Sequence, residues 1–275
     1  MDMTTAGWIA HATKQLISAG ITSAQLDSEL ILAHTLRKNR TYLHAHPDEK
    51  LGERHQQIAD ARLSLRLDRV PVAYIVGHKE FYGRRFRVTP ATLIPRPESE
   101  VLIDLLHEGI KFLAKDSPHR LADVGTGSGC LGITAKLEYP DLLVTLLDKD
   151  RHALAVASSN AKEHKADVLA LESDLLTSYP YTASIIVANL PYVDKSWERS
   201  PETEFEPAGA LFADQRGLAL IFRLIEQAPK RLISGGLLIL EADPKQHQNI
   251  IQSAQKHGLL LQKQEDYGLM FTKIV

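Results

Sequence analysis

Four consecutive residues, Asn189, Leu190, Pro191 and Tyr192, combine groups that could hold a planar nitrogen. They follow the apolar run IIVA, which has the composition of a buried strand. The side-chain oxygen of Asn189 and the main-chain oxygen of Leu190 are both hydrogen-bond acceptors. Together they could bind both hydrogens of an NH2 group, while the Tyr192 ring stacks on a flat π system. The alternative is an ordinary turn, since Asn and Pro are common turn residues.

A second segment, DVGTGSG from Asp123 to Gly129, has the glycine content of a ligand-binding loop. Glycines at every second position after a strand allow a tight turn and close approach of the backbone to a ligand. A nicotinamide dinucleotide fingerprint requires glycine or alanine where Cys130 stands. The spacing D-x-G-x-G-x-G instead resembles the first motif of S-adenosylmethionine-dependent methyltransferases. The candidate cofactor-binding residues here are Asp123, Gly125, Thr126, Gly127, Ser128 and Gly129.

Acidic residues end the next two expected strands. Asp148 could accept hydrogen bonds from ribose hydroxyls, as acids at this position do in nucleoside-binding folds. Asp150 is interpreted as the N-cap of the following helix. Asp174 could reach the amino group of an adenine, and Leu175 could cover the adenine face. The alternative for Asp174 is a polar strand end without a ligand.

These residues need a sheet that brings strand ends together, and the sequence from residue 120 onward predicts one. Strands and helices alternate there, which favours a doubly wound, mostly parallel α/β sheet. The last two strands lie too close in sequence for a helical crossover, so they should pair antiparallel. Strands are expected over 121–124, 142–147, 168–171, 185–188, 237–240, 259–263 and 268–274, and helices over 130–138, 150–162, 217–232 and 245–257.

The first 75 or so residues lack strand patterns and predict a small helical bundle. We therefore expect a helical substrate-recognition domain over 1–76, a hairpin or linker over 77–100 and a catalytic domain over 101–275. The residues expected to form the apolar faces of the helices are Trp8, Ile9, Ala12, Leu16 and Ile17, then Leu26, Leu30 and Ala33, then Leu51, His55, Ile58 and Leu65.

The order of the motifs resembles the HemK-like release-factor glutamine methyltransferases over almost the whole chain. The segments that carry the resemblance are IPRPESE (94–100), DVGTGSG (123–129), NLPY (189–192) and FEPAGAL (205–211). NLPY is similar to the [Asn/Asp]-Pro-Pro-Tyr motif of methyltransferases that act on nitrogens conjugated to carbonyls or rings. One departure is Leu190, which stands where the family usually has proline but retains the carbonyl acceptor.

The resemblance implies a Rossmann-like S-adenosylmethionine-dependent methyltransferase fold with a helical front domain. It implies transfer of a methyl group to N5 of the glutamine in the Gly-Gly-Gln motif of bacterial class I release factors. The cofactor positions it implies are Gly125 to Gly129, Asp148, Leu175 and Asn189. The substrate clamp and catalytic positions it implies are Asn189, Leu190, Pro191 and Tyr192.

Two other hypotheses stay open on the sequence. A nucleic-acid adenine-N6 or guanine-N2 methyltransferase would use the same clamp on an exocyclic amine. Against it stand a net charge of −2 and the lack of a separate basic domain, so direct nucleic-acid binding is not expected. A non-catalytic binding protein that retains the cofactor fold is the third hypothesis, and the intact DVGTGSG and Asn189 speak against it.

Composition narrows the remaining possibilities. The 275 residues are 44% hydrophobic and 24% charged, as in ordinary globular proteins. No apolar run is long enough to span a membrane, and the N-terminus does not resemble a secretory signal. The single cysteine, Cys130, excludes an internal disulfide and cysteine-rich zinc sites, and suggests a reducing cytoplasm. We interpret Cys130 as a packing residue, expect no metal, and see nothing that demands more than a monomer.

Overall fold

The computed structural model describes residues 3–113 and 118–274. The chain forms two compact units, Met1–His78 with Arg199–Phe205, and Lys79–Glu198 with Glu206–Val275. Within the described ranges, none of the helices combines the length and the apolar character that a membrane crossing requires.

The first unit is built from helices around one apolar core. Trp8, Ala12 and Leu16 recur every four residues on the first helix and are all fully buried. They pack against apolar residues of the other helices, including Leu32 and Leu63. The helices are α1 (Thr5–Ser18), α2 (Ala24–Leu36), α3 (Arg40–Ala45), α4 (Glu53–Leu67) and α5 (Val72–Val76).

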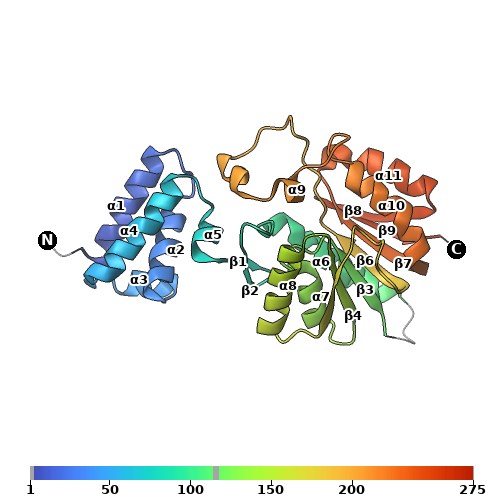
Figure 1. Ribbon diagram of the computed structural model, residues 1–275, viewed down its shortest axis with the longest axis horizontal. Helices are drawn as coiled ribbons and strands as arrows, with labels where there is room; N and C mark the ends of the chain where they lie inside the picture. Colours follow the sequence, from blue (N-terminus) through green and yellow to red (C-terminus); the bar gives the residue numbers. More distant parts are fainter. Residues whose placement is uncertain (1–2, 114–117, 275) are drawn as a thin grey trace. The chain divides into compact units, whose positions relative to one another are not determined.

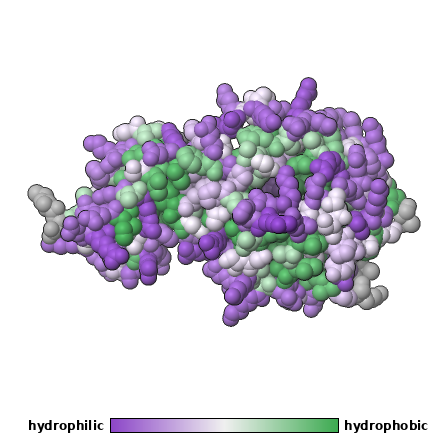
Figure 2. Space-filling model, in the orientation of Figure 1, coloured by the Kyte–Doolittle hydropathy of each residue, from purple (hydrophilic) through white to green (hydrophobic). Residues whose placement is uncertain are grey.

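The apolar faces of these helices differ from the sequence prediction in several places. Ile17 is 63% exposed, Leu26 43% and Leu65 47%, so they do not belong to the core. On α4 the buried positions are Ala59 and Leu63 instead. Apolar areas on the visible face of this unit can be seen in Figure 2. Apolar residues occur on more than one face of these helices, so periodicity identified Trp8, Ala12 and Leu16 correctly but also included exposed residues.

A segment from the second half of the sequence is part of the helical unit. The short 3-10 helix η3 (Pro201–Phe205) lies in the stretch Arg199–Phe205. Glu202 accepts a hydrogen bond from the Arg66 guanidinium at 2.9 Å, and Arg66 also binds Asp27 at 2.7 Å. Arg66 and Asp27 are buried. This connection could not be predicted from the sequence, because Arg66 and Glu202 are 136 residues apart.

The second unit begins with a hairpin and contains the predicted α/β sheet. The hairpin strands are β1 (His78–Phe81) and β2 (Arg84–Arg87). The sheet, in the spatial order β5-β4-β3-β6-β7-β9-β8, is parallel from β5 to β7, and β9 is antiparallel to both of its neighbours. Its strands are β3 (Arg120–Val124), β4 (Leu143–Asp148), β5 (Val168–Glu172), β6 (Ala183–Ala188), β7 (Leu232–Glu241), β8 (Leu259–Glu265) and β9 (Gly268–Lys273). The predicted fold class is confirmed.

Helices cover both faces of this sheet. Helices α6, α7 and α8 lie on one face and α10 and α11 on the other (Figure 1). Alternate strand residues follow this division: Ile185 and Val187 belong to one core, and Ile186 and Ala188 to the other. The bounds are η1 (Pro97–Glu100), α6 (Val101–Gly109), η2 (Ile110–Phe112), α7 (Cys130–Glu138), α8 (Arg151–Glu163), α9 (Ala208–Leu211), α10 (Ala219–Arg231), η4 (Pro244–Gln246) and α11 (His247–Lys256).

The strand register brings the candidate residues to one edge. Val124 pairs with Ala188, and Ala188 pairs in turn with Leu240. The glycine loop, the NLPY segment and the end of β7 therefore leave the sheet side by side. The carboxyl edge of such a sheet is where ligands bind in this architecture.

Candidate active site

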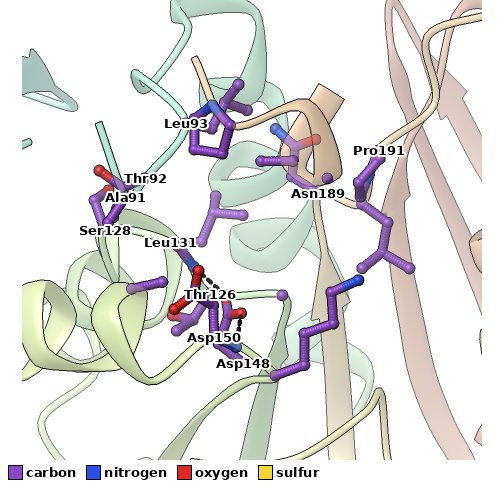
Figure 3. A pocket seen from close by; sticks show the side chains of 18 of the residues that line it. Ala91, Thr92, Leu93, Thr126, Ser128, Leu131, Asp148, Asp150, Asn189 and Pro191 are labelled. Atoms are coloured by element: carbon purple, nitrogen blue, oxygen red, sulfur yellow. Dashed lines mark hydrogen bonds between the residues drawn. The ribbon is translucent and has the colours of Figure 1, made fainter. Parts of the chain in front are cut away.

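A cavity of about 230 Å³ lies at the carboxyl edge of the sheet. In the close view of Figure 3, Asn189 and Pro191 border it on one side, and Asp148, Asp150 and Thr126 on another. Loops after β3, β4, β5 and β6 all contribute. The lining includes Gly125, Thr126, Gly127, Ser128, Asp148, Asp150, Asp174, Leu175, Asn189, Leu190 and Pro191, and also Ala91, Pro95, Ser99, Pro207, Gly209 and Ala210.

The glycine loop turns sharply at the end of β3. The amides of Gly125 and Thr126 both donate to the Leu147 carbonyl, at 2.8 and 2.9 Å. Gly125 has φ +71°, and a Cβ there would lie 2.8 Å from the Leu190 side chain. Glycine is therefore required at this position both by the turn and by the close approach of the NLPY segment.

Asp123 binds the glycine loop through hydrogen bonds and does not line the cavity. It is fully buried, and its Oδ2 accepts hydrogen bonds from the Thr126 hydroxyl at 2.6 Å and the Gly132 amide at 2.9 Å. Gly129 likewise lies outside the lining and is the N-cap residue of α7, with φ +82°. For these two residues the geometry supports a role in shaping the loop rather than direct contact with a ligand.

Burial raises the pKa of Asp123 to about 6. The folded state therefore holds the proton of the Asp123 carboxyl group more tightly than the unfolded state does. The contribution of this proton to the free energy of unfolding is fully present below the unfolded pKa near 3.8 and is lost as the pH rises through about 6. We expect the free energy of unfolding to fall by about 3 kcal/mol over this interval, relative to an Asp123→Asn variant. Denaturant unfolding of both proteins at several pH values measures the difference. Parallel pH profiles of the two proteins would contradict it.

Three acidic residues lie at the ends of β4 and β5, and each already has a partner. Asp148 accepts from the Gly127 amide at 2.9 Å and the Asp150 amide at 3.0 Å, and burial raises its pKa. Asp150 caps α8 by accepting from the His152 amide at 2.7 Å, as expected. Asp174 pairs with Arg223 at 2.6 Å, so the proposed contact with an adenine amino group would compete with this ion pair.

Apolar side chains form part of the wall between these acids. Leu175 is buried at φ +54° and lines the cavity. Cys130 also lines it, and burial raises the pKa of its thiol to about 12. The start of α7 therefore does not create a reactive thiolate, and the packing interpretation of Cys130 is the better supported one.

Asn189 is held by hydrogen bonds that involve only the nitrogen of its side chain. Its Nδ2 donates to Ser99 Oγ at 2.8 Å and to Glu241 Oε2 at 2.9 Å. Among the described residues, no group donates to its Oδ1. The Leu190 carbonyl likewise receives no backbone N–H in the described ranges. Asn189 and Leu190 both line the cavity, so these two acceptors are candidates for binding an NH2 group there.

Tyr192 does not take the position expected of a stacking ring. It is not part of the cavity lining, and its ring packs against the apolar core beside α10 and α11. Its hydroxyl donates to Glu241 Oε1 at 2.9 Å, and burial beside this carboxylate raises the pKa of Tyr192. The Leu190–Pro191 bond is trans.

Several residues hold the site in addition to the catalytic and cofactor-binding residues predicted from the sequence. Gln246 donates from Nε2 to the Tyr192 and Arg216 carbonyls, each at 2.8 Å, and so anchors the end of NLPY. Glu206 of the FEPAGAL segment is buried, accepts from the Ile94 amide at 3.0 Å and pairs with Arg96. For Glu241, which binds Asn189, the signal in the sequence was a charged residue directly after the apolar run LLIL.

The residues at the cavity suit S-adenosylmethionine. Asp148 offers a carboxylate for the ribose hydroxyls, and Leu175 offers an apolar surface for the adenine. Ser128 also lines the cavity, but its hydroxyl oxygen is buried and has no hydrogen-bond partner among the described residues. Within the same ranges, no cluster of three or more His, Cys, Asp or Glu residues could hold a metal ion.

The sheet and the cavity at its carboxyl edge have the Rossmann-like architecture of solved methyltransferases. Solved structures share the fold: a methyltransferase from Pyrococcus furiosus has a TM-score of 0.53 at 18% identity and covers 78% of this chain and 98% of its own. A Thermus thermophilus 16S rRNA N2 G1207 methyltransferase in complex with AdoMet and guanosine has a TM-score of 0.52 at 19% identity, with 72% of this chain and 50% of its own covered.

Sequence comparison identifies the family. Residues 7–77 match the PrmC N-terminal domain, and residues 99–203 match the methyltransferase small domain. A release factor glutamine methyltransferase of Koribacter versatilis is 37% identical over 85% of this chain and 86% of its own. Those of Coxiella burnetii and Escherichia coli are 36% and 34% identical, over 91% and 90% of this chain and 91% and 88% of theirs.

The chain belongs to the release factor glutamine methyltransferase family, and it is an S-adenosylmethionine-dependent methyltransferase. The family resemblance found in the sequence is thereby confirmed.

Proposed function

We propose that this protein methylates N5 of the glutamine in the Gly-Gly-Gln motif of bacterial class I release factors. The observation that carries the proposal is the orientation of Asn189, whose nitrogen donates to Ser99 and Glu241 while no residue that the structure describes donates to its oxygen. The names of the relatives support the same substrate class. A translation factor as substrate also favours action in the cytoplasm, and a monomer would suffice.

The clamp that we propose consists of Asn189 Oδ1 and the Leu190 carbonyl oxygen. Each would accept one hydrogen of the glutamine NH2 group and so fix the direction of its nitrogen lone pair. An amide nitrogen is a poor nucleophile because this lone pair is delocalised into the carbonyl. As the nitrogen bonds to carbon, positive charge grows on it, and the two acceptors stabilise that charge. Pro191 lines the same wall and limits the freedom of the segment.

The donor side of the cavity would be formed by the glycine loop, Asp148 and Leu175. S-adenosylmethionine would supply a methyl group from its positively charged sulfur: the carbon–sulfur bond breaks as the carbon–nitrogen bond forms, and neutral S-adenosylhomocysteine leaves. Asp148 would bind the ribose, the backbone of the glycine loop would bind polar groups of the donor, and Leu175 would cover the adenine. Asp174 would reach the adenine only by leaving Arg223.

The remaining proton needs no dedicated base. Once the nitrogen carries the new methyl group it is positively charged, and either of its protons can pass to water. Asn189 Oδ1 and the Leu190 carbonyl hold these protons until one leaves, which restores a neutral amide.

Transfer of labelled methyl groups tests this function. The protein is incubated with radiolabelled S-adenosylmethionine and a class I release factor, and in parallel with total RNA or DNA. We expect label in the release factor, and we expect no label when the glutamine of its Gly-Gly-Gln motif is replaced by alanine. Label in nucleic acid alone would instead support an adenine or guanine methyltransferase, whose exocyclic amines the same clamp could hold.

A further inference from the structure

The side-chain amide of Asn189 could face the cavity in two ways. Its oxygen and nitrogen are similar in size, and a half-turn about the Cβ–Cγ bond exchanges them. With the nitrogen turned toward the substrate, a donor would meet the N–H groups of the glutamine and no hydrogen bond would form. The clamp therefore works only if another group selects the orientation.

In the structure, the Glu241 carboxyl group is such a group. Both hydrogens of Nδ2 are used, one by Ser99 Oγ at 2.8 Å and one by Glu241 Oε2 at 2.9 Å. A serine hydroxyl can donate or accept, so it tolerates either orientation. Burial raises the pKa of Glu241, but both of its oxygens accept hydrogen bonds, from Asn189 and from Tyr192, so the carboxyl group acts here as an acceptor. A reversed amide would place its oxygen against the Glu241 carboxylate, which is unfavourable in a buried site.

Glu241 is itself fixed by its position in the sheet. It is the last residue of β7, next to β6 in the sheet, and the register pairs Leu240 with Ala188, so Glu241 lies beside Asn189. It is 1% exposed and lies outside the cavity lining. Its second oxygen accepts from the Tyr192 hydroxyl at 2.9 Å. A negative charge held against Nδ2 also polarises the amide and makes Oδ1 a stronger acceptor.

We infer that Glu241, assisted by Ser99, is a positioning residue that selects and polarises the Asn189 amide so that its oxygen faces the substrate nitrogen. This inference rests on the glutamine methyltransferase function proposed above. It also gives Tyr192 a role different from stacking, because the tyrosine hydroxyl holds the free oxygen of Glu241.

Steady-state kinetics of Glu241→Gln provide the first test. Glutamine keeps the size of the side chain but removes the charge and can present either end to Asn189. We expect kcat to fall about 10-fold or more, while KM for the release factor and the donor change by less than about 2-fold. Glu226→Gln is the matched control, because it removes the same kind of charge from an exposed position on α10 and should leave kcat within about 2-fold. Equal kcat values for the Glu241→Gln variant and the unmodified protein would overturn the inference.

A double-mutant cycle separates positioning from a general structural role. Glu241→Gln should have almost no effect on kcat when Asn189 is already alanine, because the amide that it orients is gone. The same fold-loss in both backgrounds would show that Glu241 acts by another route and would overturn the inference.

A measurement made without the release factor tests the role of Glu241 independently of the proposed function. In the NMR spectrum of the unmodified protein, the Nδ2 protons of Asn189 should exchange with solvent at least about 10-fold more slowly than those of the exposed Asn249. This protection should be lost in Glu241→Gln. Equal exchange of the two asparagines in the unmodified protein would overturn the inference, whereas a failure to methylate release factors would overturn only the proposed function.

Discussion

Asn189→Ala is expected to lower kcat for methyl transfer to a release factor by at least about 100-fold. Alanine removes one of the two acceptors that stabilise positive charge on the attacking nitrogen. The Leu190 carbonyl remains but leaves the second hydrogen unbound, so the nitrogen is also poorly aligned. The affinity for S-adenosylmethionine should change little, because the glycine loop, Asp148 and Leu175 are untouched.

Calorimetric titration of the donor and single-turnover kinetics of the same variant check both parts of this prediction. Retained donor binding together with lost turnover is the expected combination. A variant that turns over at the original rate would remove Asn189 from the mechanism. A variant that no longer binds the donor would mean that Asn189 serves the donor rather than the acceptor.

Gly217→Ala adds a single methyl group near the site and is expected to lower both stability and activity strongly. Gly217 has φ +83°, and a Cβ there would overlap the carbonyl oxygen of Tyr192 and lie 2.8 Å from Gln246 Nε2. The backbone must shift to relieve this overlap, which would break the hydrogen bond that anchors the end of NLPY. We expect a loss of about 3 kcal/mol or more in the free energy of unfolding, together with a large loss of activity.

Gly83→Ala is the matched control for this prediction. Gly83 also has positive φ, +69°, but a Cβ there would meet nothing within 4 Å. Its replacement should therefore cost only about 1 kcal/mol, the conformational part of the effect. Denaturant unfolding of both variants measures the difference. Equal losses would show that steric overlap at Tyr192 does not matter.

The sheet could be predicted because its strands are short apolar runs that alternate with helices of ordinary length. Burial on both faces leaves such strands with few polar residues, so β6, with the sequence ASIIVA, stands out clearly. The buried faces of the N-terminal helices were harder to predict, because apolar residues such as Ile17 and Leu65 are exposed to solvent. Only the packing of the helices decides which apolar stripe is buried.

The site was predictable where a residue follows a strand directly. Gly125, Asp148 and Asn189 all lie at strand ends, so fold class and position together bring them to one edge. Ser99 and Glu241 were missed because they contact Asn189 across 90 and 52 residues, and only the strand register and the path of η1 create these contacts. Tyr192 was assigned to the substrate because its hydrogen bond to Glu241 has no local sequence signal.

A structure of the protein with S-adenosylhomocysteine and a release factor would test the clamp most directly. The distances to measure run from the side-chain nitrogen of the Gly-Gly-Gln glutamine to Asn189 Oδ1 and to the Leu190 carbonyl oxygen. Both distances should be about 3 Å. The sulfur of the donor product should lie in line with the lone pair of the glutamine nitrogen. A glutamine nitrogen bound elsewhere, or an Asn189 that turns its nitrogen toward the substrate, would contradict the account.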